Sequence, residues 1–293
     1  MSGAGERWGT ALRDWALPEW ILDRAPESPY GYPTECFRSR GERSIDRDLT
    51  PTTRHALEAL PEGGSVLDVG VGGGATSLPL ASKASRITGV DASEEMLDAF
   101  RRTAASIGPL ELVTVLGSWP EVAVRPADVV VCGHVLYNVQ DLEPFVLALT
   151  DHARHRVVVE ITNRHPWSWM SDLWRRFHDL ERPEEPTADD AEAALSELGL
   201  QPRRKDRVST DPGGGFIRAE DAVALTRRRL CLGAERDGEV REALGERLAE
   251  RDGLWSAGPT EQTLVTFWWD APQREQLTQR RRTTFFESNS PRS

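Results

Sequence analysis

A cluster of glycines beside an acidic residue is the part of the sequence that points most directly to chemistry. In the stretch SVLDVGVGGGATSLP, residues 65–79, four glycines follow an apolar run that contains Asp68. A glycine inside a regular element costs roughly 0.5–1 kcal/mol relative to alanine, so a cluster at the start of a helical pattern requires a cause. A tight turn would be one cause, and a backbone that lies flat against a ligand would be another.

A second acid, Asp91, favours the ligand. It ends the next apolar run, 21 positions after Gly70, where a carboxylate can accept hydrogen bonds from both hydroxyls of a ribose. Gly70, Gly72 and Ala75 also satisfy the pattern G-x-G-x-x-A of dinucleotide sites, so a nicotinamide cofactor is an alternative. The Asp68 carboxylate would repel a pyrophosphate, but not a zwitterionic amino acid that bears a sulfonium. The position of Asp68 therefore counts against a dinucleotide site.

These residues need a scaffold, and the chain supplies alternating strand and helix patterns. Strands are predicted over residues 66–69, 86–90, 112–116, 129–132, 156–161, 203–208 and 263–269. The central runs are rich in Val and Ile with little period-2 alternation, as in strands covered on both faces. Ser93, Asp141 and Thr187 are predicted to cap three of the intervening helices. Alternating βα units indicate an α/β fold with a doubly wound, mostly parallel sheet.

Four segments in chain order strengthen this interpretation. The motifs VLDVGVGGG, GVDASEEML, LGSWPE and ADVVVCGHVLYNV resemble those of class I S-adenosylmethionine-dependent methyltransferases. The resemblance covers roughly residues 51–200, and the predicted strand 263–269 is similar to the last, antiparallel strand of that family. It implies a Rossmann-like, mostly parallel seven-stranded sheet, with S-adenosyl-L-methionine as cofactor lying across the strand ends.

The same resemblance implies a set of cofactor-binding positions. They are Asp68, Gly70, Gly72, Asp91, Ala92, Met96, Ser118, Trp119, Cys132 and Gly133. The two glycines would face the methionine part of the cofactor, with the preceding acid supporting their loop. Asp91 would hold the ribose, and Ala92 and Met96 would flank the adenine. Cys132 and Gly133 would pass near the amino acid end.

The third motif departs from the family pattern. Many relatives carry an aspartate there that reads the adenine amino group, whereas this chain has Gly117, Ser118 and Trp119. Ser118 can accept a hydrogen bond and Trp119 can pack on the ring, so these two residues are the expected substitutes.

Methyl transfer from a sulfonium is an in-line displacement that needs a general base only when the acceptor must lose a proton. His134 directly follows the fourth predicted strand and is the first candidate base, with Tyr137 after it. Glu160 and His165 are predicted to project from the end of the fifth strand to the same edge. Each also has a structural interpretation: a hydrogen-bonded loop histidine, a packed tyrosine, or a satisfied buried acid.

Several aromatic residues lie outside the predicted core. We predict an N-terminal helical lid over residues 1–50, a core over 51–272 with insertions at about 163–186 and 211–260, and a polar, flexible tail over 273–293. The predicted lid aromatics are Trp8, Trp15, Trp20, Tyr30, Tyr32, Trp167, Trp169 and Trp174. They would exclude water and suit an apolar or aromatic acceptor. Alternatively, they cover the sheet and stabilise a homodimer.

Composition narrows the class of protein. The net charge of −11 disfavours a nucleic-acid partner, because such binding depends on Lys and Arg neutralising phosphates. The three cysteines form no metal-ligand pattern, and no apolar run approaches the roughly 20 residues of a membrane span. No signal-peptide pattern begins the chain, so a cytoplasmic protein without metal or membrane partner is expected.

The sequence thus predicts an S-adenosylmethionine-dependent methyltransferase that acts at oxygen or nitrogen of a small molecule. Two alternatives remain open. One is an NAD(P)-dependent oxidoreductase, and the other is a protein that binds S-adenosylmethionine for regulation without transferring methyl.

Overall fold

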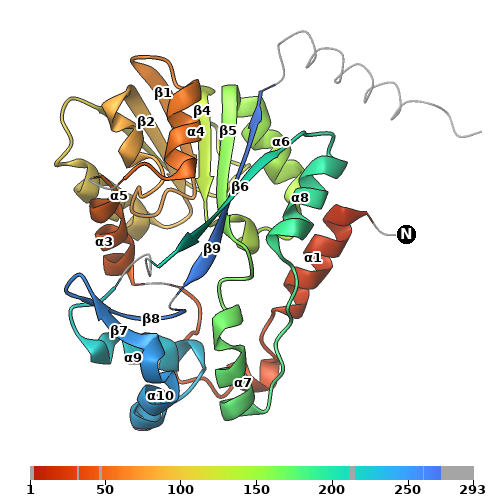
Figure 1. Cartoon of the computed structure of the whole chain (residues 1–293), viewed down its shortest axis with the longest axis vertical. Coiled ribbons are helices and arrows are strands. Elements are labelled where there is room, and N and C mark those ends of the chain that lie inside the picture. The colour runs from red at the N-terminus through yellow and green to blue at the C-terminus, as the bar shows by residue number, and fades with distance from the viewer. Residues whose placement is uncertain (1–2, 32, 46–47, 211–214, 260, 272–293) are drawn as a thin grey trace, which may run out of the picture.

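A seven-stranded sheet forms the centre of the computed structural model, which describes residues 3–31, 33–45, 48–210, 215–259 and 261–271 (Figure 1). The strand order is β3-β2-β1-β4-β5-β9-β6. The strands are β1 (Gly64–Val69), β2 (Ala84–Asp91), β3 (Glu111–Leu116), β4 (Ala127–Gly133), β5 (Ala153–Thr162), β6 (Arg203–Ser209) and β9 (Gln262–Asp270). Strands β1 to β5 are parallel, and β9 is antiparallel to both of its neighbours. The predicted fold class and strands are confirmed.

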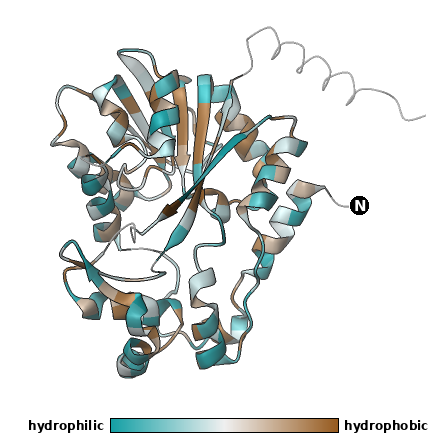
Figure 2. Ribbon diagram, in the orientation of Figure 1, coloured by the Kyte–Doolittle hydropathy of each residue, from teal (hydrophilic) through white to brown (hydrophobic). Residues whose placement is uncertain are grey.

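Alternate residues of the central strands enter two separate hydrophobic clusters, which explains their unbroken apolar runs. In β4, Val129 and Val131 pack into one cluster and Val130 and Cys132 into the other. One face is covered by α1 (Ala4–Asp14), α6 (Leu142–His152) and α8 (Ala188–Glu197), and the other by α4 (Pro51–Ala59) and α5 (Glu94–Ala104). Figure 2 shows apolar residues along the central strands and polar residues on the outward helix faces.

Two of the three predicted helix caps are confirmed. The Ser93 hydroxyl accepts a hydrogen bond from the Met96 N–H at the start of α5. At the start of α8, the Thr187 N–H and hydroxyl both donate to the Asp190 carboxylate. The third prediction is wrong in detail: helix α6 follows Asp141, but the Asp141 side chain makes no capping bond. The third helical residue there is a proline, which has no N–H to offer to a cap.

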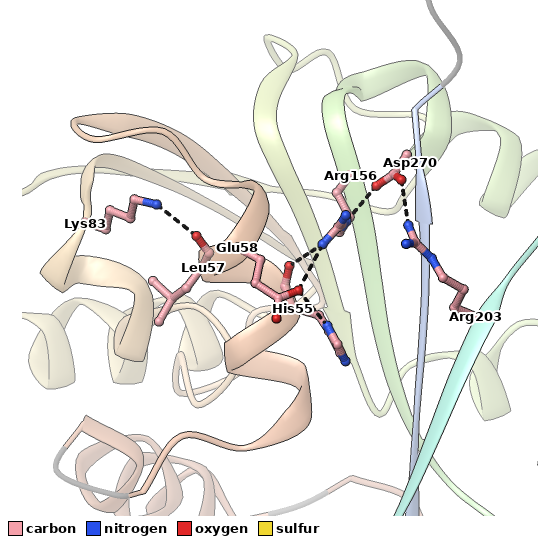
Figure 3. Close-up of polar contacts among 7 residues, drawn as sticks. All are labelled: His55, Leu57, Glu58, Lys83, Arg156, Arg203 and Asp270. Atoms are coloured by element: carbon pink, nitrogen blue, oxygen red, sulfur yellow. Dashed lines mark hydrogen bonds and ion pairs between the residues drawn. The ribbon is translucent and has the colours of Figure 1, made fainter.

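Polar contacts hold α4 to strand β5 at the edge where the parallel strands begin (Figure 3). Arg156 of β5 donates to the Asp270 carboxylate (2.7 Å) and to the His55 carbonyl (3.1 Å), and Arg203 of β6 donates to the same carboxylate (2.6 Å). At the opposite end of α4, the Thr52 hydroxyl reaches the side chain of a β5 residue near the strand terminus. The first turn of α4 is therefore held at the edge where the strands end.

A third hydrophobic cluster lies apart from the sheet and is built from the segments that do not fit the βα alternation. Its elements are α2 (Glu19–Leu22), α7 (Ser171–His178), α9 (Ala219–Arg229) and α10 (Asp237–Leu244), with a hairpin of β7 (Leu248–Arg251) and β8 (Leu254–Ala257). These elements gather beyond the carboxyl ends of the sheet strands (Figure 1). The hairpin lies in the predicted insertion at about 211–260 and was not itself predicted, although Asp252 and Gly253 are a strong turn signal.

Two sequence predictions lie outside the described residues: the lid aromatic Tyr32 and the tail over 273–293. Within the described part of the chain, no helix is both long and apolar enough to cross a membrane.

Candidate active site

A cavity of about 980 Å³ separates the ends of the sheet strands from the third hydrophobic cluster. Small-molecule sites typically enclose roughly 300–1,000 Å³, so this cavity is large enough for two ligands. Among the predicted residues, those in its wall are Gly70, Gly72, Asp91, Ala92, Met96, Ser118, Trp119, Gly133, His134, Tyr137, Glu160 and His165. Two predicted cofactor residues are not in the wall: Asp68 and Cys132 are buried within their strands.

Backbone hydrogen bonds tie the glycine loop to the end of β2. The N–H groups of Gly70 and Val71 donate to the Val90 carbonyl (2.9 and 3.0 Å), and the Gly72 N–H donates to Asp91 Oδ2 (2.9 Å). The other Asp91 oxygen accepts from the Ser93 N–H (3.0 Å). Each carboxylate oxygen retains a second lone pair, so Asp91 can organise the loop and still accept bonds from a ligand.

Close packing answers why the loop is made of glycines. Gly70 has φ +74°, and a Cβ there would lie 2.3 Å from a methyl carbon of Val135. A Cβ on Gly73 would lie 2.2 Å from the carbonyl oxygen of Phe37, and a Cβ on Gly41 would lie 2.1 Å from the carbonyl oxygen of Gly73. Helix α3 (Thr34–Ile45), which carries Phe37 and Gly41, therefore lies directly against the loop. The tight turn is therefore present, and the close approach seen here is that of α3 and Val135; the approach of a ligand to the loop stays a prediction.

The Asp68 carboxyl lies under the loop in an apolar setting. Burial raises its pKa to about 7, and the nearby charge of Asp91 acts in the same direction against the opposing effect of Ser77. Neither oxygen has a hydrogen-bond partner of normal geometry among the described residues.

A buried polar network occupies the ends of β4 and β5. His134 has φ +61°, its N–H donates to the Glu160 carbonyl (2.7 Å), and its Nε2 lies 3.1 Å from Glu160 Oε1. The Thr52 hydroxyl lies 2.6 Å from Glu160 Oε2, and an Arg207 nitrogen lies 3.5 Å from the same oxygen. Because an ionised carboxylate only accepts, Nε2 carries the proton in this contact and Nδ1 keeps its lone pair.

The pKa values of His134 and Glu160 are both lowered in this network. Burial lowers the pKa of the His134 imidazole, and the charges of Arg40 and Arg207 lower it further, against the effect of Glu160. Burial alone would raise the pKa of the Glu160 carboxyl, but His134, Thr52 and Arg207 outweigh it and bring the pKa to about 2. At neutral pH, Glu160 is therefore ionised and His134 is neutral.

Aromatic rings line the remaining wall. Trp15 stacks on His165 with centroids 3.9 Å apart, and Tyr30 stacks on Trp167 at 6.0 Å. Burial, assisted by the charge of a neighbouring arginine, lowers the pKa of His165 to about 3, so this ring is also neutral.

The other predicted lid aromatics lie elsewhere. Trp8 is fully buried in the sheet core and donates from Nε1 to the Val139 carbonyl, Trp174 is fully buried in the third cluster, and Trp20 is largely exposed. Trp169 lines the cavity with the two stacked pairs.

Several residues of the wall were not predicted as site residues. Among them are Phe37, Arg40, Thr52, Arg207 and Arg229. A signal for the position of Thr52 exists, because Thr50 followed by Pro51 is a helix-start pattern, and the Thr50 hydroxyl does cap α4. No local sequence pattern around the three arginines indicates that they line the site.

Comparisons with known proteins agree with the geometry. A family model described as a methyltransferase domain matches residues 66–155, from β1 to the start of β5. A solved structure from Bacillus halodurans C-125, described as a "putative methyltransferase", shares the fold with a TM-score of 0.51 at 15% identity, covering 77% of this chain and 99% of that chain.

Two further structures have lower scores. A cyclopropane-fatty-acyl-phospholipid synthase-like protein from Lactobacillus casei ATCC 334 has a TM-score of 0.49 at 16% identity, over 86% of this chain and 98% of that one. Magnesium protoporphyrin IX methyltransferase from Synechocystis PCC 6803, solved with bound S-adenosylhomocysteine, has a TM-score of 0.46 at 14% identity, over 88% and 98%. No curated protein sequence matches the chain.

Proposed function

We propose that the chain, whose residues 66–155 match a methyltransferase domain, is a class I S-adenosylmethionine-dependent methyltransferase that methylates an oxygen or nitrogen atom of a small aromatic molecule. The match to a methyltransferase domain supports the expected family and cofactor and favours them over the nicotinamide alternative. The observation that supports a small acceptor is the cavity itself. It runs from the glycine loop and Asp91 to His134 and the aromatic wall, enclosed between the strand ends and the elements of the third cluster.

The cofactor end of the cavity fits an adenosyl group. Glycine backbone, the Asp91 carboxylate and the side chains of Met96 and Trp119 lie in one continuous wall. We assign Asp91 to the ribose hydroxyls and Trp119 to the adenine ring; the Trp119 Nε1 donates to the Phe145 carbonyl, which fixes the indole in place. When bound, the cofactor supplies a methyl group made electrophilic by its sulfonium.

His134 is our proposed general base. Glu160 holds the proton on Nε2, which leaves the Nδ1 lone pair to accept a proton from the acceptor. With the cofactor bound, the acceptor atom would be able to displace the sulfur at the methyl carbon, and the electron pair of the carbon–sulfur bond would go to sulfur. The proton on Nδ1 returns to solvent. Glu160 is a positioning residue in this scheme, since it acts through His134.

Tyr137 has a different role in this proposal. Its hydroxyl donates to the Thr162 carbonyl (2.9 Å), and burial raises its pKa above the ordinary value for a tyrosine. Both features disfavour proton transfer, so we assign Tyr137 to shaping the cavity wall.

A labelling experiment tests the class of acceptor. The purified protein would be incubated with methyl-labelled S-adenosylmethionine and three acceptor sets: aromatic phenols and amines, total RNA, and denatured protein. We expect label in the small-molecule set alone. Transfer to RNA or protein, with none to the small molecules, would overturn the proposal.

The contact between α3 and the glycine loop gives a separate prediction. In Gly41→Ala the new Cβ would lie 2.1 Å from the Gly73 carbonyl oxygen, so the helix must move off the loop. Overpacking of this kind costs about 1–3 kcal/mol, and we expect calorimetry to show at least about fivefold weaker binding of S-adenosylhomocysteine. Gly5→Ala is the matched control, because a Cβ on this other helical glycine meets nothing within 4 Å. Equal affinity of the two variants would contradict the account of the loop.

A further inference from the structure

His165 lies in the cavity wall but has no role in the proposed reaction. It belongs to the loop that leads from β5 to α7. The face of its imidazole packs on Trp15, with ring centroids 3.9 Å apart and planes 13° apart. The rings of Tyr137 and Trp167 approach it edge to face, at 5.4 and 6.3 Å. Three aromatic contacts therefore fix the orientation of this imidazole.

A backbone contact fixes the position of the proton on the same ring. The Trp167 N–H donates to His165 Nδ1 (3.2 Å), so Nδ1 carries a lone pair and no proton. Burial and the charge of Arg182 lower the pKa of this imidazole to about 3, so the ring is neutral at neutral pH. A neutral imidazole with a lone pair on Nδ1 carries its proton on Nε2.

The two histidines of the wall are complementary. In His134, Glu160 binds the N–H and the lone pair is left for an acceptor molecule. In His165, the lone pair is bound, whereas Nε2 has no hydrogen-bond partner among the described residues and is not enclosed by protein atoms. Tyr137 follows His134 by three residues and its ring contacts that of His165, so both histidines border the same part of the cavity. His165 is therefore a hydrogen-bond donor to this part of the cavity and not a base.

A donor in a cavity wall selects what binds over it. A ligand that covers the N–H with apolar atoms removes its water without replacing the hydrogen bond, whereas a ligand oxygen at this point restores the bond. We propose that the acceptor molecule carries an oxygen that accepts a hydrogen bond from His165 Nε2, in addition to the atom that receives the methyl group near His134. The substrate is then a phenol or aromatic amine with a carbonyl or similar oxygen as its second polar group. This inference rests on the proposed function and names its substrate class.

Calorimetry on the protein saturated with S-adenosylhomocysteine tests the inference. The probes are meta- and para-hydroxyacetophenone, each compared with the isopropenylphenol of the same ring position, in which a methylene group replaces the ketone oxygen. We expect at least one ketone to bind about tenfold more tightly than its alkene, because the alkene leaves the N–H unpaired. In His165→Phe, which keeps a ring for Trp15 to stack on but has no donor, this ratio should fall to near unity. In His165→Gln, whose amide nitrogen can donate in place of Nε2, the ratio should exceed that of His165→Phe.

The matched control is His55→Phe. The His55 ring also stacks on a tryptophan, Trp268, with centroids 3.6 Å apart. It lies outside the cavity wall, at the edge of the sheet where the parallel strands begin, so the ratio should persist in this variant (Figure 3). Unchanged affinity for S-adenosylhomocysteine verifies that each variant is folded.

Two results would overturn the inference: a wild type that binds neither ketone more tightly than its alkene, or a ratio that is retained in His165→Phe. The labelling experiment decides the proposed function separately. Methylated phenols without any preference for the ketones would overturn this inference alone, whereas label on RNA or protein alone would remove the proposed function itself.

Discussion

Replacing Asp91 by alanine is expected to weaken S-adenosylhomocysteine binding by roughly 2–3 kcal/mol, or about 30- to 150-fold. Two effects contribute. The variant loses the acceptor for the ribose hydroxyls, and it also loses the bond that holds the Gly72 N–H to the end of β2. Isothermal titration of wild type and variant measures the difference directly.

A control variant distinguishes the loss of a cofactor contact from the general effect of removing a negative charge. Asp98→Ala removes an acid from the exposed surface of α5, where it pairs with Arg101, and it should leave the affinity unchanged. If Asp91→Ala binds S-adenosylhomocysteine as tightly as Asp98→Ala does, then Asp91 does not bind the ribose hydroxyls. The assignment of the adenosyl site would then be wrong.

Replacing His134 by asparagine is expected to lower kcat by about 10²- to 10⁴-fold, which is the usual contribution of general base catalysis. Asparagine suits this position because it tolerates the left-handed backbone that His134 adopts at φ +61°. The variant should therefore fold and bind S-adenosylhomocysteine normally. Turnover with an acceptor from the small-molecule set is the measurement, and His155→Asn, on an exposed residue outside the cavity wall, is the control.

The pH dependence of kcat gives the same prediction a second readout. Protonation of the imidazole as the pH falls removes the lone pair, so the wild-type rate should decline at acidic pH. The midpoint should lie below 6.5, because burial and the two arginines lower the pKa of His134. The decline should disappear in His134→Asn. A variant that retains the wild-type rate and profile would show that alignment alone suffices and that no base acts at this position.

The sheet and the cofactor end of the site could be predicted because their signals are local. The runs of Val and Ile mark strands buried on both faces, and the glycines and Asp91 stand at fixed offsets from strand ends. The roles assigned to these residues stay predictions until a ligand is bound.

The acceptor end depends on pairings that local patterns do not encode. Strand β9 is last in the sequence among the described strands, yet it inserts between β5 and β6. This places Arg207 of β6 opposite Leu264 and within reach of Glu160. Nothing in the charged run around Arg207 distinguishes it from Arg203 and Arg204 of the same strand.

The tryptophans show a related limit. Trp8 and Trp15 belong to one helical stripe in the sequence, but Trp8 is buried against the sheet core while Trp15 stacks on His165 in the cavity wall. An amphipathic pattern indicates which side of a helix is buried, but not which neighbour buries it.

A crystal structure of the protein with S-adenosylhomocysteine tests the central claim most directly. The account predicts the amino acid part against the glycine loop, both ribose hydroxyls on Asp91, and the sulfur directed to the part of the cavity that contains His134. Binding outside this cavity, or a ribose that makes no contact with Asp91, would contradict it.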